Sequence, residues 1–383
     1  MADSSSLRSH DDATSFSWAS TRTAVEQNPS LLSWGSGSQP SVPSIDDDAE
    51  TETRSISGSV RSSTMSIDSS LYHFVEEHGR TYHRYKEGSK KYPTSIDVRP
   101  RIDIIPYSPG YFLPNDTAEQ ERLDLQHQLF TIAVGNKLNI APFSEDPRRV
   151  LDIATGTGIW AIEYAVQHPG SQVLGTDLSP IQPQFLPENC RFEIDDVEDE
   201  WAFSEPFDFI HGRALMSCFN DPATVVKQGF ENLAPGGIME FQDALFPMNY
   251  VGDAPVNSAL YRWNELMVEG VARLGRSWSN VKNYKRYFEE AGFEDIVEKR
   301  FYWPTSPWAK GLYFKLMAAY FQEDMLAGLE GMSLKVLGGL GMSPDQVRTF
   351  VEEVKRDFRD TNVHAYLTVT YIYGRKPGSI SEE

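Results

Sequence analysis

Residues 150–162 read VLDIATGTGIWAI, an apolar strand that runs into a glycine-rich turn and then into a helix. From Arg149 onward, short apolar runs alternate with stretches of helical period, the pattern of βαβ units and a parallel sheet. Gly156 and Gly158 let the backbone approach a bound nucleotide closely, and the helix start offers free N–H groups. The motif therefore favours a nucleotide-binding α/β fold over a turn that only packs helix on strand.

The same alternation predicts the rest of the sheet. Residues 307–358 are rich in Met, Leu and Phe at helical spacing, and Ser343 followed by Pro344 opens their last helix as N-cap and first residue. We interpret them as a helical cap inserted before the last strand. Their aromatic side chains pack in a core or form the wall of a pocket for an aromatic or polyketide-like acceptor. The predicted strands are 150–154, 172–177, 191–195, 207–212, 236–242, 296–303 and 364–376.

The N-terminal part has a different character. Residues 1–70 contain 27 Ser or Thr and few aliphatic side chains, so we predict a disordered arm, either a solvated tail or a phosphorylated regulatory segment. Residues 71–140 form an N-terminal extension with a helix whose N-cap is Asp116, from which Glu119 bonds back. We expect residues 80–133 to close over a ligand as a lid, or to dock permanently on the sheet flank. The main domain spans residues 141–377.

Charge and cysteine content exclude several classes of function. A formal net charge of -20 argues against direct nucleic-acid binding or attraction to an anionic membrane. Only Cys190 and Cys218 occur, which excludes a disulfide framework and a multi-cysteine zinc site, and we predict no metal. The N-terminal sequence lacks the apolar region of a secretory signal, and no long apolar run occurs. We expect a protein of the cytosol or nucleus.

Two cofactors fit the glycine-rich turn. Residues 156–161 match the G-x-G-x-x-A form of the dinucleotide fingerprint, and Asp177 has the spacing of its ribose-binding acid, which leaves an NAD-dependent oxidoreductase open. Asp152, at the end of the first strand, would repel a pyrophosphate but suits the cationic amino acid end of a sulfonium ligand. S-adenosylmethionine is therefore favoured.

Later segments support this choice. Asp195 and Asp196 close the third strand and offer an acceptor to an adenine amino group, with Val197 beside the ring, unless they belong to a solvated acidic loop. Residues 233–240, LAPGGIME, read as a helix end, a tight turn and the next strand, a placement common in methyltransferase sheets.

The sequence resembles the fungal LaeA-like methyltransferases over residues 72–377. The resemblance rests on VLDIATGTGIW, GTDLSPIQP, FEIDDVEDEW, FDFIHGR and LAPGGIMEFQ, and on RTYH, YFLPND, ERLDLQH, EGMSL and the final HAY and YGRKP, which lie outside the generic cofactor fold. It implies a class I, Rossmann-like fold with seven strands, the last antiparallel, and helices on both faces. It also implies a role in secondary metabolism, as a tailoring enzyme with a small-molecule acceptor or as a nuclear regulator with a velvet-type protein partner.

Site residues follow by position from the motifs and the resemblance. Where the family has its first glycine, this chain has Ala154, which fits if its φ stays negative. His211, after the fourth strand, is a candidate to orient or deprotonate an acceptor, and His127 on the lid helix is a weaker one; each is otherwise a packing histidine. Arg213 is a candidate partner for a substrate carboxylate. The predicted cofactor-binding residues are Asp152, Ala154, Gly156, Thr157 and Gly158 for the methionine part, Asp177 and Leu178 for the ribose, and Asp195, Asp196 and Val197 for the adenine.

Overall fold

The computed structural model describes residues 41–44, 75–82 and 111–378. Its main feature is a seven-stranded sheet with strand order β5-β4-β3-β6-β7-β9-β8, and all seven predicted strands are present. The class I α/β fold is therefore confirmed. The strands are β3 (Arg149–Ile153), β4 (Gln172–Asp177), β5 (Cys190–Ile194), β6 (Phe207–Arg213), β7 (Leu233–Tyr250), β8 (Glu294–Pro304) and β9 (Ala365–Arg375).

Strand direction determines where a ligand site can form. β3 pairs in parallel with β4 on one side and with β6 on the other. The chain therefore adds strands first on one side of β3 and then on the other. In open α/β sheets, ligands bind at the carboxyl ends of the strands at this switch point. β9 runs antiparallel between β7 and β8, as predicted for the last strand.

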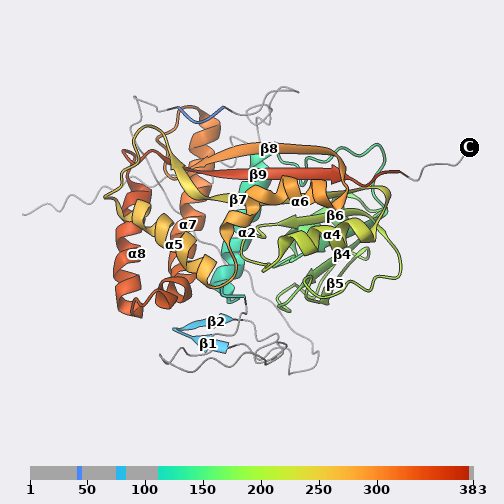
Figure 1. Cartoon of the computed structure of the whole chain (residues 1–383), viewed down its shortest axis with the longest axis horizontal. Coiled ribbons are helices and arrows are strands. Elements are labelled where there is room, and N and C mark those ends of the chain that lie inside the picture. The colour runs from blue at the N-terminus through green and yellow to red at the C-terminus, as the bar shows by residue number, and fades with distance from the viewer. Residues whose placement is uncertain (1–40, 45–74, 83–110, 379–383) are drawn as a thin grey trace, which may run out of the picture.

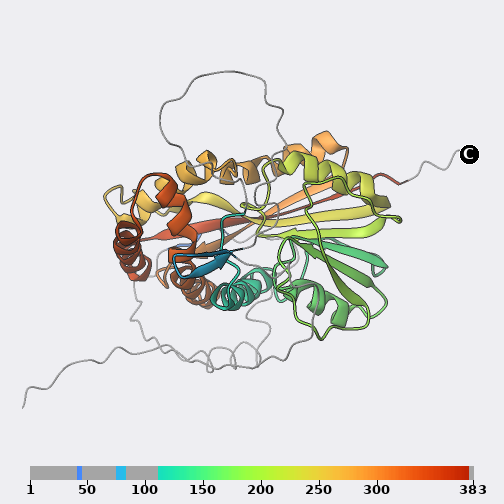
Figure 2. The same cartoon turned by 90° about the horizontal axis from the view of Figure 1, so that it is seen from below.

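Helices cover both faces of the sheet (Figure 2). α3 (Ile159–Gln167) packs on one face, where Trp160 and Tyr164 are buried against Phe209 of β6. α4 (Pro222–Asn232) and α6 (Tyr284–Ala291) cover the opposite face. No helix among the described residues is long and apolar enough to cross a membrane.

The sheet continues far beyond the nucleotide-binding strands. β7 was predicted to end at residue 242 but runs to Tyr250, where it still pairs with Ala365 of β9. β8 pairs with the same part of β9, and this three-stranded extension carries a group of helices on the left of Figure 1. Ser343 caps the last of them through a complete capping box, as its sequence predicts. The helices are α5 (Ala259–Arg273), which was not predicted, α7 (Leu312–Gly339) and α8 (Pro344–Arg359), with η2 (Trp278–Asn283) nearby.

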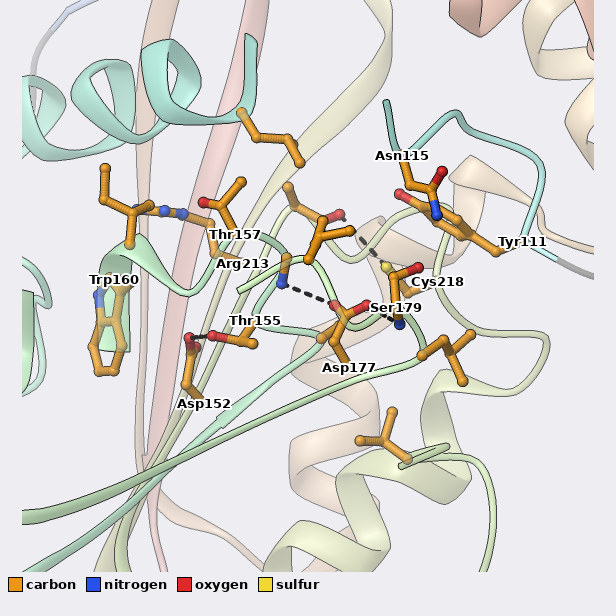
Figure 3. A pocket seen from close by; sticks show the side chains of 18 of the residues that line it. Tyr111, Asn115, Asp152, Thr155, Thr157, Trp160, Asp177, Ser179, Arg213 and Cys218 are labelled. Carbon is orange, nitrogen blue, oxygen red and sulfur yellow. Dashed lines mark hydrogen bonds between the residues drawn. The ribbon is translucent and has the colours of Figure 1, made fainter. Parts of the chain in front are cut away.

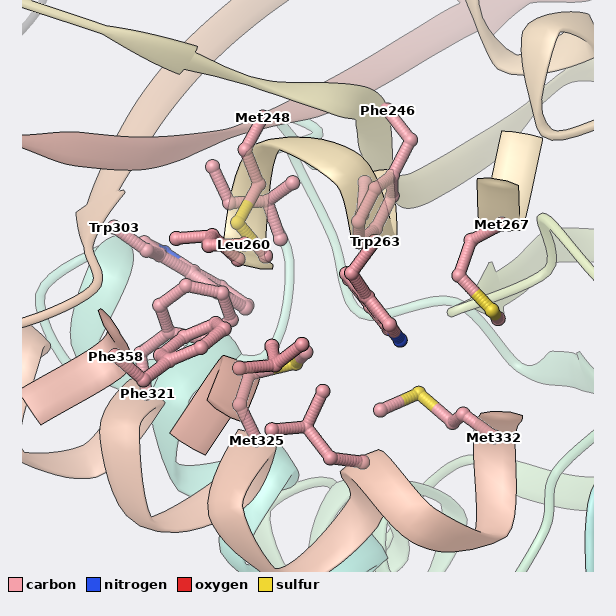
Figure 4. Close-up of a cluster of buried hydrophobic side chains, with 14 of the residues drawn as sticks. Phe246, Met248, Leu260, Trp263, Met267, Trp303, Phe321, Met325, Met332 and Phe358 are labelled. Carbon is pink, nitrogen blue, oxygen red and sulfur yellow. The ribbon is translucent and has the colours of Figure 1, made fainter. Parts of the chain in front are cut away.

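The largest apolar core lies between these helices and the sheet extension (Figure 4). Three side chains are almost fully buried there against Trp263 of α5. They are Trp303 of β8 and, from the predicted cap segment, Phe321 and Met325. These side chains fill a core, which is the first of the two alternatives that the sequence left open.

α2 (Thr117–Ala133) joins the two parts of the molecule. Its second half is buried in the same core, and its N-cap Asp116 accepts a hydrogen bond from the Glu119 backbone N–H, 3.0 Å away. The Glu119 side chain does not bond back to the cap as predicted. It pairs with Arg122, whose other end bonds to Asp324 of α7 at 2.6 Å. All three charged side chains are almost fully buried.

Two short segments precede α2. β1 (Val75–Glu77) and β2 (Arg80–Tyr82) form an antiparallel hairpin that lies against α7, where Lys335 stacks on the Tyr82 ring. Residues 41–44 contact the start of the cap, since the Ser44 carbonyl accepts from the Lys310 N–H at 2.7 Å. The rest of the predicted arm and the first part of the predicted lid, His83 included, lie outside the described residues.

Candidate cofactor pocket

A cavity opens at the carboxyl edge of β3, β4, β5 and β6, where the topology predicts a ligand site. The space between its lining atoms is about 1060 Å³, its open mouth included. One wall is the glycine-rich turn and the strand ends, and the facing wall is the start of α2 with the residues before it (Figure 3). Ten of the twelve predicted site residues line it: Asp152, Ala154, Gly156, Thr157, Asp177, Leu178, Asp195, Asp196, Val197 and His211.

The turn after β3 uses left-handed backbone at alternate residues. Gly156 has φ +60° and Gly158 has φ +79°, which glycine adopts without strain. Ala154 has φ +50°, so the expectation that it keeps a negative φ is wrong. An alanine in this region carries about 1–3 kcal/mol of strain. Gly158 does not line the cavity, and a Cβ there would stand 2.4 Å from the Phe192 ring of β5, so a glycine is needed for the turn to pack on that strand.

Asp177 lies at the end of β4 with both carboxylate oxygens anchored. Oδ2 accepts from the Gly156 N–H at 2.8 Å and Oδ1 accepts from the Ser179 N–H at 2.9 Å. Burial nevertheless raises its pKa to about 6. A carboxylate held in this way has lone pairs left for the hydroxyl groups of a ribose.

Two side chains fix the position of the Asp152 carboxylate. Oδ1 accepts from Nδ1 of His211 at 2.7 Å, and Oδ2 accepts from the Thr155 hydroxyl. The His211 ring is fully buried and stacks on Trp160, with ring centroids 3.7 Å apart. Burial lowers the pKa of His211, so the neutral ring donates to Asp152. His211 therefore orients Asp152 and has no exposed atom with which to deprotonate an acceptor.

The acidic loop after β5 is ordered by its own backbone. Asp195 accepts from the Asp196 N–H at 2.9 Å, and Asp196 accepts from the Glu198 N–H at 3.0 Å. Glu198 in turn accepts from the backbone of the loop after β6. Val197 is buried beside the cavity. The two aspartates are half-buried and line the pocket.

His127 lies outside the cavity lining. Its ring is fully buried, where Nδ1 accepts from Nη2 of Arg213 at 2.9 Å and Nε2 lies 3.1 Å from the Glu163 carboxylate. Burial lowers the pKa of His127. The ring does not reach the cavity, so its place in the structure is that of a packing histidine, the alternative that the sequence left open. Arg213 does reach the cavity.

The facing wall contains residues that the sequence did not single out. Asn115 lies just before α2, where its Oδ1 accepts from the Thr81 hydroxyl at 2.9 Å and its amide nitrogen points into the cavity (Figure 3). The signal available was YFLPND, which resembles the family but names no role. The other residues of this kind on the facing wall are Tyr111, Pro114, Leu123 and Gln126, and the loop after β6 adds Cys218 and Phe219 to the lining.

The chemistry of the lining fits S-adenosylmethionine. Its acids provide acceptors for an ammonium group, a ribose and an adenine amino group, while a pyrophosphate would face five carboxylates. One buried atom of the facing wall, Nδ2 of Asn115, has no hydrogen-bond partner within the described part of the chain. A buried polar group without a partner is costly, so a polar ligand would satisfy it.

Comparisons with known proteins agree with this site. Residues 125–298 match a family model described as a methyltransferase domain. The chain is 32% identical to the methyltransferase pytC of Aspergillus terreus, over 82% of this chain and 92% of that protein. It is also 32% identical to the probable methyltransferase tdiE of Emericella nidulans, over 68% of this chain and 83% of that protein.

A third relative is a regulator. The chain is 30% identical to the secondary metabolism regulator laeA of Aspergillus flavus, over 80% of this chain and 78% of that protein. The NAD-dependent alternative finds no support among these relatives, and S-adenosylmethionine is the cofactor. The fold, the pocket and the relatives lead to one conclusion: the chain belongs to the LaeA-like family of fungal, class I S-adenosylmethionine-dependent methyltransferases.

Proposed function

We propose that this methyltransferase acts on a small-molecule acceptor in secondary metabolism. The observation that carries the proposal is the two-sided cavity, with acids at the strand ends and a mixed wall made by Tyr111 and Asn115 before α2 and by Phe219 in the loop after β6. An acceptor with a flat apolar body and a polar oxygen suits that wall, because the amide of Asn115 donates and the rings pack. The relatives pytC and tdiE are named methyltransferases, which is consistent with an enzyme.

The cofactor placement that we propose follows the strand ends. Asp152 and Gly156 contact the methionine part, Asp177 accepts from the ribose hydroxyls, and Asp195 or Asp196 with Val197 holds the adenine. When bound, the cofactor supplies a methyl group on a positively charged sulfur. The protein's part is to hold the acceptor atom in line with that group and to exclude water, since proximity and orientation provide most of the rate.

His211 and His127 take positioning roles in this proposal. His211 fixes the Asp152 carboxylate through Nδ1, and His127 bonds to Arg213. Transfer from a sulfonium needs a base only when the nucleophile keeps its proton. We therefore assign neither histidine to proton transfer.

The second candidate function is regulation of secondary metabolism through a protein complex, located in the nucleus. The observation in its favour is the 30% identity to the regulator laeA of Aspergillus flavus over most of both chains. In this case the partner is a protein, for which we keep a velvet-type partner as the hypothesis. An enzyme of small molecules needs no such partner and works in the cytosol as well.

Gly156→Val separates these functions when it replaces the chromosomal copy. A β-branched side chain is strained at φ +60° and would meet Leu123 across the cavity, so we expect cofactor affinity to fall by at least about tenfold. Gly170→Val is the control, because that glycine has open space around it and an ordinary φ.

Metabolite profiles of the two strains then decide. An enzyme predicts that the Gly156→Val strain loses one compound family and accumulates precursors that lack one methyl group. A regulator predicts that many unrelated compounds change together, or that none changes if the cofactor is dispensable. Either regulatory profile would contradict the proposed enzyme. Calorimetry with S-adenosylhomocysteine on the purified variants confirms that only Gly156→Val has lost binding.

A further inference from the structure

Arg213 is a cation without an ionic partner beside the pocket. It ends β6, is half-buried, and lines the cavity. No carboxylate of the described residues forms an ion pair with it, although the cavity holds several acids. A charge removed from water needs a partner of opposite charge, or it destabilises the fold.

Asp152, Glu163 and Asp124 act on the Arg213 charge from a distance, and its direct contacts are with uncharged groups. Nη2 donates to Nδ1 of His127, a neutral ring, and the guanidinium carbon lies 5.2 Å from the centroid of the Phe130 ring. A neutral acceptor and an aromatic face stabilise a cation only partly. Burial consequently lowers the pKa of Arg213 from its usual value.

The position of Arg213 relative to Asp152 indicates which kind of ligand group pairs with the guanidinium. Asp152 of β3 pairs in register with His211 of β6, and Arg213 follows two residues later. Side chains two residues apart on a strand lie on the same face, so Arg213 stands beside Asp152 and nearer the carboxyl edge. An anionic group on one side and a cationic group on the other form a site for a zwitterion.

We propose that Arg213 binds the carboxylate of the cofactor's amino acid end while Asp152 binds its ammonium group. This inference rests on the cofactor placement proposed above and assigns to it a residue of β6. An arginine fork matches a carboxylate in two parallel hydrogen bonds, which gives orientation as well as affinity. Binding at the amino acid end fixes the orientation of the cofactor and so the position of its methyl group.

His127 is a positioning residue in this arrangement. Its charged and titratable neighbours are Arg213 of β6, Glu163 of α3 and Asp124 of α2. Nε2–H donates to Glu163, which leaves the Nδ1 lone pair to accept from Arg213. This tautomer holds the guanidinium in place without neutralising it.

The test compares S-adenosylmethionine with its decarboxylated form, which keeps the sulfonium and the ammonium group and lacks only the carboxylate. Calorimetry on the full-length wild-type chain should show S-adenosylmethionine binding on the order of tenfold to a hundredfold more tightly. In Arg213→Met the two affinities should become equal, close to the wild-type affinity for the decarboxylated form. Arg213→Lys, which keeps the charge but not the fork, should restore part of the preference.

The outcomes separate this inference from the proposed function. A wild-type chain that binds both molecules equally overturns the role of Arg213 and leaves the methyltransferase intact, and this arm needs no variant to fold. A preference that survives in folded Arg213→Met also overturns it. A wild-type chain that binds neither molecule contradicts the cofactor placement itself. His127→Phe should weaken the preference for S-adenosylmethionine without abolishing binding of the decarboxylated form.

Discussion

At the scale of single residues, Asp177 gives the pocket a dependence on pH. Burial raises its pKa to about 6, so the free protein holds a charged carboxylate only above that pH. Ribose hydroxyls donate to the charged form, and protonation removes an acceptor. We therefore expect the affinity for S-adenosylhomocysteine to be constant above pH 7 and to fall by roughly tenfold per pH unit below about 6.

Stability of the free protein should respond to Asp177 with the opposite sign. Because the folded pKa lies above the usual value of 3.8, the folded state takes up the proton first, and this residue's contribution to stability rises as the pH falls from about 6 toward 4. Asp177→Asn should bind weakly and show no such pH dependence of affinity. If the variant titrates like the wild type, another group controls the pocket.

The residues of the turn show how far sequence reasoning reaches at this scale. Asp152, Gly156 and Asp177 were predictable because their roles depend on local spacing along a strand and a turn. The φ of Ala154 was not, since nothing in the sequence distinguishes an alanine that tolerates a left-handed backbone from one that avoids it. The pairing of His211 with Asp152 depends on strand register, which the sequence does not specify.

At the scale of elements, a buried charge cluster determines whether α2 can move. Arg122 of α2 bonds to Glu119 on its own helix and to Asp324 of α7, with all three side chains at most 5% exposed. Removing one member of such a cluster leaves its partners charged and buried, so Arg122→Met should lower the free energy of unfolding by about 3–5 kcal/mol. Arg262→Met, which breaks an exposed ion pair with Glu353, should lower it by at most about 1 kcal/mol.

The same cluster bears on the lid. Exchange of the α2 amides should be slow with and without S-adenosylhomocysteine, because opening the helix would separate Arg122 from Asp324. This packing favours the permanently docked helix that the sequence left open. Ligand-dependent protection across all of residues 117–133 would support the lid instead. If Arg122→Met and Arg262→Met lower the free energy of unfolding equally, the buried cluster contributes no more to stability than an exposed ion pair.

A helix or strand was predictable when the residues that indicate it are neighbours in the sequence. The seven strands follow from apolar runs, and α8 begins at Ser343 as its capping residues indicate. α5 and the second half of β7 were missed because their apolar residues face a core built from distant segments. For the same reason the aromatic side chains of α7 could not be assigned to core or pocket before the fold was known.

At the scale of the whole molecule, the arm is not uniform. Pro43 is buried, and Ser44 is hydrogen-bonded to Lys310 at the start of the cap, although composition alone predicts that residues 1–70 add nothing to the core. Deleting residues 1–40 should leave the melting temperature unchanged, whereas deleting residues 1–70 should lower it by a few degrees, as expected for about 1 kcal/mol. Differential scanning calorimetry of the two truncations decides, and equal melting temperatures would show that the contact at Ser44 carries no stability. Cofactor affinity should be the same in both.

The bond between Arg122 and Asp324 joins residues that are far apart in the chain and belong to the two parts of the molecule, the pocket wall and the helical cap. A graft of α7 from a relative onto this chain would bring a foreign partner to a buried arginine unless α2 came with it. We therefore expect a cap exchanged between two such enzymes to fold stably only when α2 and α7 are transferred together.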